Sequence, residues 1–327
     1  MLRTQFFKTM AIFLAVSLGL VFFNADDGMC QSFPNRPVTI IIPFSAGGST
    51  DVLVRSLSAV AEKKLGVPLI INNKPGAGGT VGQTELARSK PDGYTIGTLS
   101  IGASCVIPQL RKVHYNIEKD YEFIGGISAF TYGLFVKSDS RFKTLTDVIK
   151  EARANPGKIT YGTMSPFIQT ALLSVEQKEK VKMTYVPFGS GSKATAGLLG
   201  GHIDIAIIST DAVKFLESKD IRMLASAAPE RWELVPDVPT MKEMGYNVDV
   251  TSWCSIAAPA GVNKAQLKIF SDAFKEAHSD PGVMSFFKKR NAYVPYRSGE
   301  EIKKFFLDKK EEFKPFIETI KAGQKKK

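Results

Sequence analysis

The chain has 327 residues and a formal net charge of +11 at pH 7, with 44% hydrophobic and 23% charged residues. This length is too great for one ordinary core and favours two α/β lobes. The lysines and arginines are scattered rather than interleaved with aromatic residues in a stripe, which argues against nucleic acid as a partner and leaves a solvated basic surface or an anionic small ligand.

An apolar stretch at residues 10–23 follows a basic N-terminus. It is shorter than a bilayer span and is typical of the hydrophobic region of a secretory signal peptide. Small residues stand at the positions that a signal peptidase inspects if the cut falls after Ser32. We therefore predict a signal peptide at 1–32 and a periplasmic mature chain. Lipid attachment at Cys30 and an uncleaved membrane anchor are the alternatives.

The mature chain opens with an apolar run at 38–42, a glycine loop at 43–48 and a helical pattern. Glycines let this loop bend tightly and leave its amides uncovered. The amides of the first helical turn and the positive end of the helix dipole favour an anion. A turn between strand and helix that binds nothing is the alternative. Three side chains are candidates for the helix cap: Ser49, Thr50 and Asp51.

Strand-like and helix-like segments then alternate almost without exception. Such alternation predicts parallel sheets with helices on both faces, in which ligands gather at the carboxyl ends of the strands. The loops at these ends carry glycine, serine or threonine. They lie at 43–51, 74–80, 100–104, 162–167, 187–191 and 209–211.

Later helices carry their own start signals. Thr144 with Asp147, and Ser298 with Glu301, have the spacing of a capping box. The second box predicts one last helix from residue 300 to about 322, with a kink at Pro315.

The residue patterns of enzymes are missing from the sequence. The three histidines have no partner at metal-ligand spacing, and no Cys-x-x-Cys occurs. The nucleophile elbow, the dinucleotide fingerprint and the phosphate-binding loop are also missing. We therefore expect no metal, no cofactor and no catalytic residue; Asp51 as a general base is the enzymatic alternative. Cys105 and Cys254 either form a disulfide or stay as two buried thiols.

Eight motifs, in order, resemble those of the substrate-binding proteins of tripartite tricarboxylate transporters, also called Bug proteins. The resemblance covers roughly residues 33 to 320. The motifs are Phe33-Pro34-Asn35-Arg36-Pro37-Val38 with Ile42-Pro43-Phe44-Ser45-Ala46-Gly47-Gly48-Ser49-Thr50-Asp51, then Asn73-Lys74-Pro75-Gly76-Ala77-Gly78-Gly79, Pro91-Asp92-Gly93-Tyr94-Thr95, Asn155-Pro156-Gly157-Lys158, Leu198-Leu199-Gly200-Gly201, Pro236-Asp237-Val238-Pro239-Thr240 and Ala257-Ala258-Pro259-Ala260-Gly261.

The resemblance implies a two-lobe periplasmic binding protein fold of the type II kind, with mixed or parallel sheets flanked by helices and a ligand cleft between the lobes. The first lobe would comprise 33–133 and 254–327, and the second lobe 134–253. The implied function is a monomeric receptor that captures a small organic carboxylate and delivers it to a membrane permease with one large and one small subunit. A receptor that feeds a sensor protein, and an enzyme that acts on a carboxylate in the same cleft, are the alternatives.

The loop rule and the resemblance together predict the ligand-binding residues, with the family's main carboxylate contacts in the loops at 44–50 and 162–167. They are Phe44, Ser45, Ala46, Gly47, Gly48, Ser49, Thr50, Asp51, Gly78, Ser100, Thr163, Met164, Ser165, Phe167, Gly189, Ser190, Asp211 and Trp253.

One stretch departs from the family pattern. Where the family usually has glycines, serines and a histidine, this chain has Met164, Pro166 and Phe167. Proline removes a donor amide, and the other two add apolar surface. We therefore expect a monocarboxylate, or a carboxylate with a hydrophobic or aromatic body, in preference to citrate. Packing of Met164 and Phe167 beneath the loop is the alternative.

Overall fold

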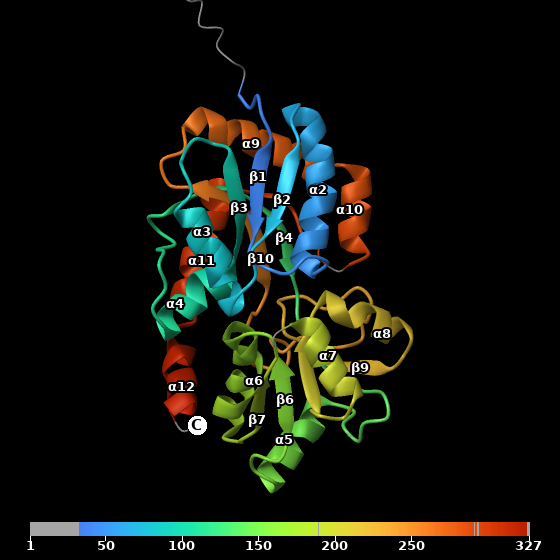
Figure 1. Cartoon of the computed structure of the whole chain (residues 1–327). Coiled ribbons are helices and arrows are strands. Elements are labelled where there is room, and N and C mark those ends of the chain that lie inside the picture. The colour runs from blue at the N-terminus through green and yellow to red at the C-terminus, as the bar shows by residue number, and fades with distance from the viewer. Residues whose placement is uncertain (1–32, 189, 291, 293, 326–327) are drawn as a thin grey trace, which may run out of the picture. The chain divides into compact units, whose positions relative to one another are not determined.

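The computed structural model of the chain describes residues 33–188, 190–290, 292 and 294–325. The chain divides into a short unit, 1–35, and a large unit, 36–327. Figure 1 shows the large unit, which contains every helix and strand discussed below. The expected signal peptide at 1–32 and Cys30 lie outside the described residues.

The first sheet has six strands in the order β11-β4-β10-β3-β1-β2. Strand β1 pairs in parallel with β2 and β3, whereas β10 runs antiparallel to both β3 and β4. The sheet is therefore mixed. Its strands are β1 (Val38–Ile42), β2 (Leu69–Asn73), β3 (Thr95–Ser100), β4 (Tyr121–Phe130), β10 (Ser252–Pro259) and β11 (Arg297–Ser298).

Helices cover both faces of this sheet (Figure 1). Strand β1 is made of valine, threonine and isoleucine. Ile40 and Ile41, whose side chains point to opposite faces, are both buried, as expected for a strand covered on both sides. The helices and short turns around it are α2 (Ser49–Leu65), η1 (Ala77–Gly79), α3 (Thr80–Ala87), η2 (Gly102–Val106), α4 (Ile107–Leu110), α9 (Lys264–His278), α10 (Pro281–Lys288) and α11 (Gly299–Glu312).

The second sheet has five strands in the order β7-β6-β8-β5-β9. Strand β6 is parallel to β7 and β8, and β5 is antiparallel to β8 and β9. Its strands are β5 (Gly133–Lys137), β6 (Thr160–Thr163), β7 (Thr184–Pro187), β8 (Ile205–Ile208) and β9 (Ile221–Ser226). Its helices are α5 (Leu145–Ala154), α6 (Pro166–Glu179), α7 (Gly191–Leu199), η3 (Thr210–Ala212) and α8 (Val213–Glu217).

Each sheet has its own apolar core. In the second, the rings of Phe135 and Trp232 meet edge to face with their centroids 5.6 Å apart. Both residues belong to a buried cluster that also includes Leu198 and Ile208. This burial gives the second sheet a hydrophobic centre separate from the residues around β1.

The chain passes between the sheets twice. It leaves the first sheet after β4 and enters the second at β5, with only Thr131 and Tyr132 between them. It returns to the first sheet at β10 after the irregular segment 227–251. The last helix, α12 (Lys314–Lys325), then lies against α6, where Gln177 Nε2 donates a hydrogen bond to Thr319 Oγ1 at 3.1 Å.

The helix ends agree with the sequence in two places and differ in a third. The capping boxes of Thr144 with Asp147 and of Ser298 with Glu301 are confirmed, each with both hydrogen bonds formed. The prediction of one last helix was wrong, because α11 ends at Glu312 and α12 begins two residues later. The ring of Pro315 would clash with the carbonyl four residues earlier, so a helix break is favoured just upstream. Proline is well tolerated in the first turn of α12.

Within the part of the chain that the structure describes, none of the helices combines the length and the apolar character needed to cross a membrane.

Candidate ligand-binding site

The side chain of Asp51, which is 2% exposed, stabilises the loop between β1 and α2 through hydrogen bonds. Its Oδ2 accepts a hydrogen bond from the backbone amide of Gly47 at 2.9 Å. The prediction that a side chain caps α2 was wrong, because Gly48 occupies the cap position and no side chain bonds there. Asp51 is already in the first turn of the helix and reaches back to the loop instead.

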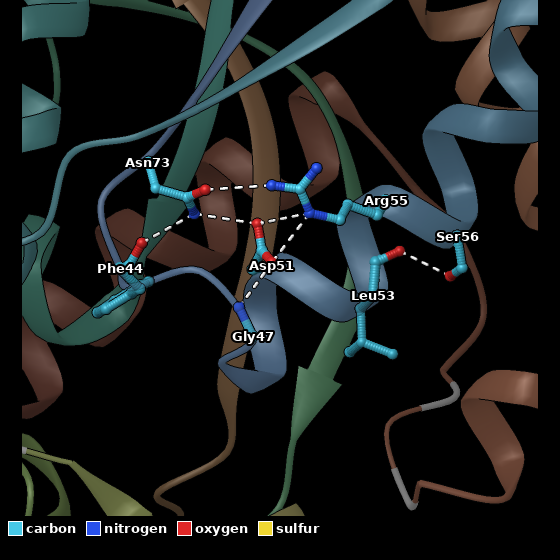
Figure 2. Close-up of polar contacts among 7 residues, drawn as sticks. All are labelled: Phe44, Gly47, Asp51, Leu53, Arg55, Ser56 and Asn73. Atoms are coloured by element: carbon cyan, nitrogen blue, oxygen red, sulfur yellow. Dashed lines mark hydrogen bonds and ion pairs between the residues drawn. The ribbon is translucent and has the colours of Figure 1, made fainter.

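Arg55 and Asn73 complete the anchor around Asp51 (Figure 2). Arg55 Nε lies 3.0 Å from both carboxylate oxygens of Asp51. Asn73 Nδ2 donates to Asp51 Oδ1 and to the carbonyl oxygen of Phe44, each at 3.0 Å. Burial alone would raise the pKa of Asp51, but the hydrogen bonds from Arg55, Gly47 and Asn73 outweigh it and hold that pKa below its ordinary value. Asp51 is thus an ionised support for the loop.

A cavity of about 400 Å³ opens beside this loop. Both sheets contribute loops to its wall, and so do the segments that join the sheets. The lining residues are Pro43, Phe44, Ser45, Gly48, Ser49, Thr50, Pro75, Gly76, Ala77, Gly78, Gly79, Ser100, Gly102, Ala103, Phe130, Tyr132, Met164, Ser165, Phe167, Ile168, Ser190, Gly191, Ser192, Ser209, Asp211, Ser252, Trp253 and Cys254.

Most of the predicted ligand-binding residues lie in this lining. Those brought together are Phe44, Ser45, Gly48, Ser49, Thr50, Gly78, Ser100, Met164, Ser165, Phe167, Ser190, Asp211 and Trp253. Four others lie outside the lining: Asp51 and Gly47 bond each other, Ala46 is exposed, and Thr163 is fully buried at the end of β6. Gly189 is not among the described residues.

Some lining residues were not among the predicted contacts. Three of them lie in loops that the sequence predicts to be near the ligand, so the sequence could have identified them: Pro75, Gly76 and Ser209. Phe130 and Tyr132 lie where the chain first crosses between the sheets. Gly133 follows Tyr132 directly, but no glycine-rich loop or helix start marks this crossing as part of a ligand site.

The polar side of the cavity offers amides and hydroxyls. Gly48, Ser49 and Thr50 at the start of α2 line the cavity, and the backbone amides of a first helical turn have no carbonyl partner within the helix. Together with the helix dipole they favour a carboxylate or another anion. Ser49 Oγ also lies 2.6 Å from Thr210 Oγ1, so this turn touches the loop that follows β8 in the second sheet.

The lining is unusual in its charges. Among the described residues of the lining, none is lysine, arginine or histidine, and Asp211 is the one carboxylate. Backbone amides therefore have to provide the positive potential for an anion. No group of three or more histidine, cysteine, aspartate or glutamate side chains suited to a metal ion occurs in the described part of the chain.

Aromatic and aliphatic side chains form the rest of the lining. Phe167 belongs to the lining, but it is 1% exposed and its ring meets Phe313 edge to face at 5.0 Å, so the side chain packs mainly beneath the loop. Trp253 lies with the guanidinium of Arg297 over its ring at 4.3 Å. Met164 is half-buried. These side chains suit an apolar ligand body.

The two cysteines are buried and free. Cys105 Sγ donates to the carbonyl oxygen of Phe306 at 3.1 Å, and burial raises the pKa of the Cys254 thiol to about 12. A thiol with so high a pKa is a poor nucleophile at neutral pH. Cys254 therefore contributes apolar surface to the cavity.

Two α/β sheets joined by two crossings, with a cavity between their loops, define a solute-binding protein of the two-lobe periplasmic binding protein class. Solved structures support this fold. Periplasmic binding protein BugD has 27% sequence identity and a TM-score of 0.76, and the match covers 86% of this chain and 98% of BugD. MatC from Rhodopseudomonas palustris, solved with bound malate, has 26% identity and a TM-score of 0.78, with 87% and 100% covered.

The sequence is similar to that of curated proteins over nearly its whole length. It is 33% identical to the UPF0065 protein in the gbd 5′ region of Cupriavidus necator, over 98% of each chain. It is 27% identical to protein BugT of Bordetella pertussis, over 93% of this chain and 94% of BugT. The family model of the tripartite tricarboxylate transporter family receptor (TctC) matches residues 53–322. The chain belongs to this receptor family.

Proposed function

We propose that this protein is a periplasmic receptor that captures a small organic carboxylate and delivers it to a tripartite tricarboxylate permease with one large and one small subunit. The observation that carries the proposal is the first turn of α2, where Ser49 and Thr50 line a cavity with no lysine, arginine or histidine among its described lining residues. Such a turn binds an anion without a side-chain cation. MatC, a relative of similar fold, holds malate.

The ligand in this proposal has one carboxylate and an apolar or aromatic body. Its carboxylate lies at the first turn of α2, and its body lies against Phe44, Met164, Phe167 and Trp253. A second strongly hydrated carboxylate on that side would lose water without gaining enough donors. Citrate is therefore a poorer ligand than a monocarboxylate of similar size.

Binding in this proposal closes two lobes. The first comprises roughly 33–132 and 252–327, and the second 133–251. The bounds expected from the sequence, 133/134 and 253/254, shift by one or two residues because β5 of the second sheet begins at Gly133 and β10 of the first begins at Ser252. The hydrogen bond between the hydroxyls of Ser49 and Thr210 joins the lobes at the cavity. Helix α12 belongs to the first lobe by sequence, but it contacts α6 of the second lobe. It would have to pivot as the lobes close.

A native mass spectrum of protein purified without refolding tests the proposal directly. We expect one bound organic acid per chain, released by unfolding, and calorimetry with that acid on ligand-free protein should give one site. The Gly48→Val variant, which covers the amides of the loop, is the control that should lose binding. Conversion of the acid by the purified protein, or binding of neutral solutes only, would contradict a carboxylate receptor.

Export and delivery need separate measurements. N-terminal sequencing of protein from a periplasmic extract should begin at Phe33 if residues 1–32 are a signal peptide. Uptake of the bound acid should fall in cells that lack this chain and return with the wild-type chain but not with Gly48→Val. Normal uptake without the chain would favour a role outside transport.

A further inference from the structure

Asp211 is the one carboxylate among the described residues of the cavity lining. It lies in the short turn η3, directly against Gly191 at the start of α7, where an added Cβ would collide with Asp211 Oδ2. Within the described residues its carboxyl accepts a hydrogen bond from its own backbone amide and from no side chain. Burial raises the pKa of this carboxyl above its ordinary value, and the charge of Lys214 opposes that rise. Asp211 thus has acceptor capacity to spare.

The hydroxyl of Ser209 is a second group whose hydrogen-bonding capacity the described residues do not use. Ser209 is 5% exposed and lines the cavity, and its Oγ has no hydrogen-bond partner in the described structure. Buried hydroxyls are normally satisfied, so an unpaired one beside a cavity indicates a partner that comes from a ligand or from water. A hydroxyl and a carboxyl with spare acceptor capacity therefore lie two residues apart on one wall.

Asp211 is also close to the expected carboxylate position. Thr210, its neighbour in the chain, is hydrogen-bonded to Ser49 at 2.6 Å, and Ser49 is the first residue of α2. A ligand carboxylate at the amides of α2 therefore has Asp211 beside it rather than at the far end of the cavity. A second anionic group there would face like charge at short range.

We infer that Asp211 is a specificity-determining residue that selects acids carrying a hydrogen-bond donor, an ammonium or a hydroxyl, on the carbon next to the carboxylate. The inference deepens the proposed function and depends on it. The ligand carboxylate binds the first turn of α2, its neighbouring donor binds the carboxyl of Asp211 with Ser209 at its side, and its apolar body meets Phe44 and Trp253. An ammonium would also neutralise the one charged side chain of the lining.

Four acids that differ only at this carbon test the inference by calorimetry on ligand-free protein. They share a benzyl body and carry an ammonium (L-phenylalanine), a hydroxyl (L-3-phenyllactate), a hydrogen (3-phenylpropanoate) or a second carboxylate (benzylmalonate). Hydrogen bonds to a charged group typically change affinity by tenfold or more. Wild type should therefore bind the ammonium and hydroxyl acids at least about tenfold more tightly than 3-phenylpropanoate, and benzylmalonate most weakly.

The Asp211→Asn variant keeps the shape and removes the charge. It should lose about tenfold or more for L-phenylalanine, bind 3-phenylpropanoate nearly as wild type does, and bind benzylmalonate more tightly. Glu217→Gln is the matched control, because Glu217 is exposed on α8, belongs to the same segment and is outside this cavity lining. It should leave the ranking of the four acids unchanged. Thermal unfolding without ligand confirms that both variants fold.

The outcomes separate this inference from the receptor proposal. Preference of wild type for 3-phenylpropanoate or benzylmalonate overturns the inference and leaves a carboxylate receptor. An unchanged ranking in Asp211→Asn overturns the role of Asp211. If none of the four binds while the native mass spectrum contains another carboxylate, the inference is wrong and the receptor proposal stands. If neither experiment finds a carboxylate, both are wrong.

Discussion

Replacing Asp51 by asparagine tests whether the anchor beneath the first loop stabilises the protein. The asparagine side chain has one acceptor oxygen where the carboxylate has two, and its amide group would face the donors of Arg55, Gly47 or Asn73. Each buried hydrogen bond to a charged group contributes about 1.5–3 kcal/mol. Arg55 is half exposed, so its share is reduced by solvent and stays near or below about 1 kcal/mol.

The expected loss in the free energy of unfolding is therefore about 3 kcal/mol. Urea titration should show a lower midpoint with an unchanged slope, since the folded surface is the same. Asp308→Asn is the matched control, because Asp308 also pairs with a basic residue four positions away, Lys304, but both are largely exposed. It should change the unfolding free energy by about 0.5 kcal/mol or less.

Acid should reduce the difference between wild type and Asp51→Asn. The pKa of Asp51 is lower in the folded than in the unfolded chain, so the carboxylate stabilises the fold at any pH above its ordinary range. This contribution falls as the pH drops through the folded pKa, where the carboxyl takes up a proton. Equal unfolding free energies of Asp51→Asn and Asp308→Asn at neutral pH would refute the reasoning, since the anchor would then contribute nothing.

Three further results follow from the cavity. The Gly48→Val change places a Cβ 3.1 Å from the carbonyl oxygen of Ser45 and covers the backbone amides beside it. Ligand affinity should therefore fall about tenfold or more while the fold persists. Normal ligand binding by this variant would show that the loop is only a structural turn. Saturating ligand should reduce the radius of gyration in small-angle scattering and change the fluorescence of Trp253, which is buried in the lining; an unchanged radius would argue against lobe closure. The Phe167→Ala change should lower the free energy of unfolding by about 3–5 kcal/mol, because the ring of Phe167 packs against Phe313. A loss of ligand affinity with an unchanged free energy of unfolding would show that packing is not the main role of this ring.

Local patterns predicted the parts of the fold that depend on neighbouring residues. The strand, loop and helix at 38–65 and both capping boxes are governed by contacts within a few positions. The direction of β10 is different, because it pairs with β3 and β4 more than 120 positions away along the chain. Alternation of strands and helices therefore predicted parallel pairing and missed the antiparallel strand in the middle of the first sheet.

The same distinction applies to the cavity. Glycine, serine and threonine loops at strand ends marked most of its wall, because helix starts are visible in the sequence. The role of Asp51 depends on Asn73, which is 22 positions away, so the pattern could suggest a cap but not the anchor that forms. The position of Asp211 in a loop at the end of a strand predicted that it lies near the ligand. That its carboxyl has few hydrogen-bond partners among the described residues can be seen only in the folded structure.

The two connections between the sheets have a mechanical consequence. Phe130 and Tyr132 lie at the first connection, and Ser252 and Trp253 lie where the chain returns, yet all four also line the cavity. In the proposed closure, the backbone segments that bend would also touch the ligand body. A substitution that changes the shape of this part of the cavity would also change the stiffness of the two connections. Ligand affinity and the angle through which the connections bend would therefore change together. If the lobes close as proposed, adaptation to a new ligand body at these positions would alter how far they close as well as how tightly the ligand binds.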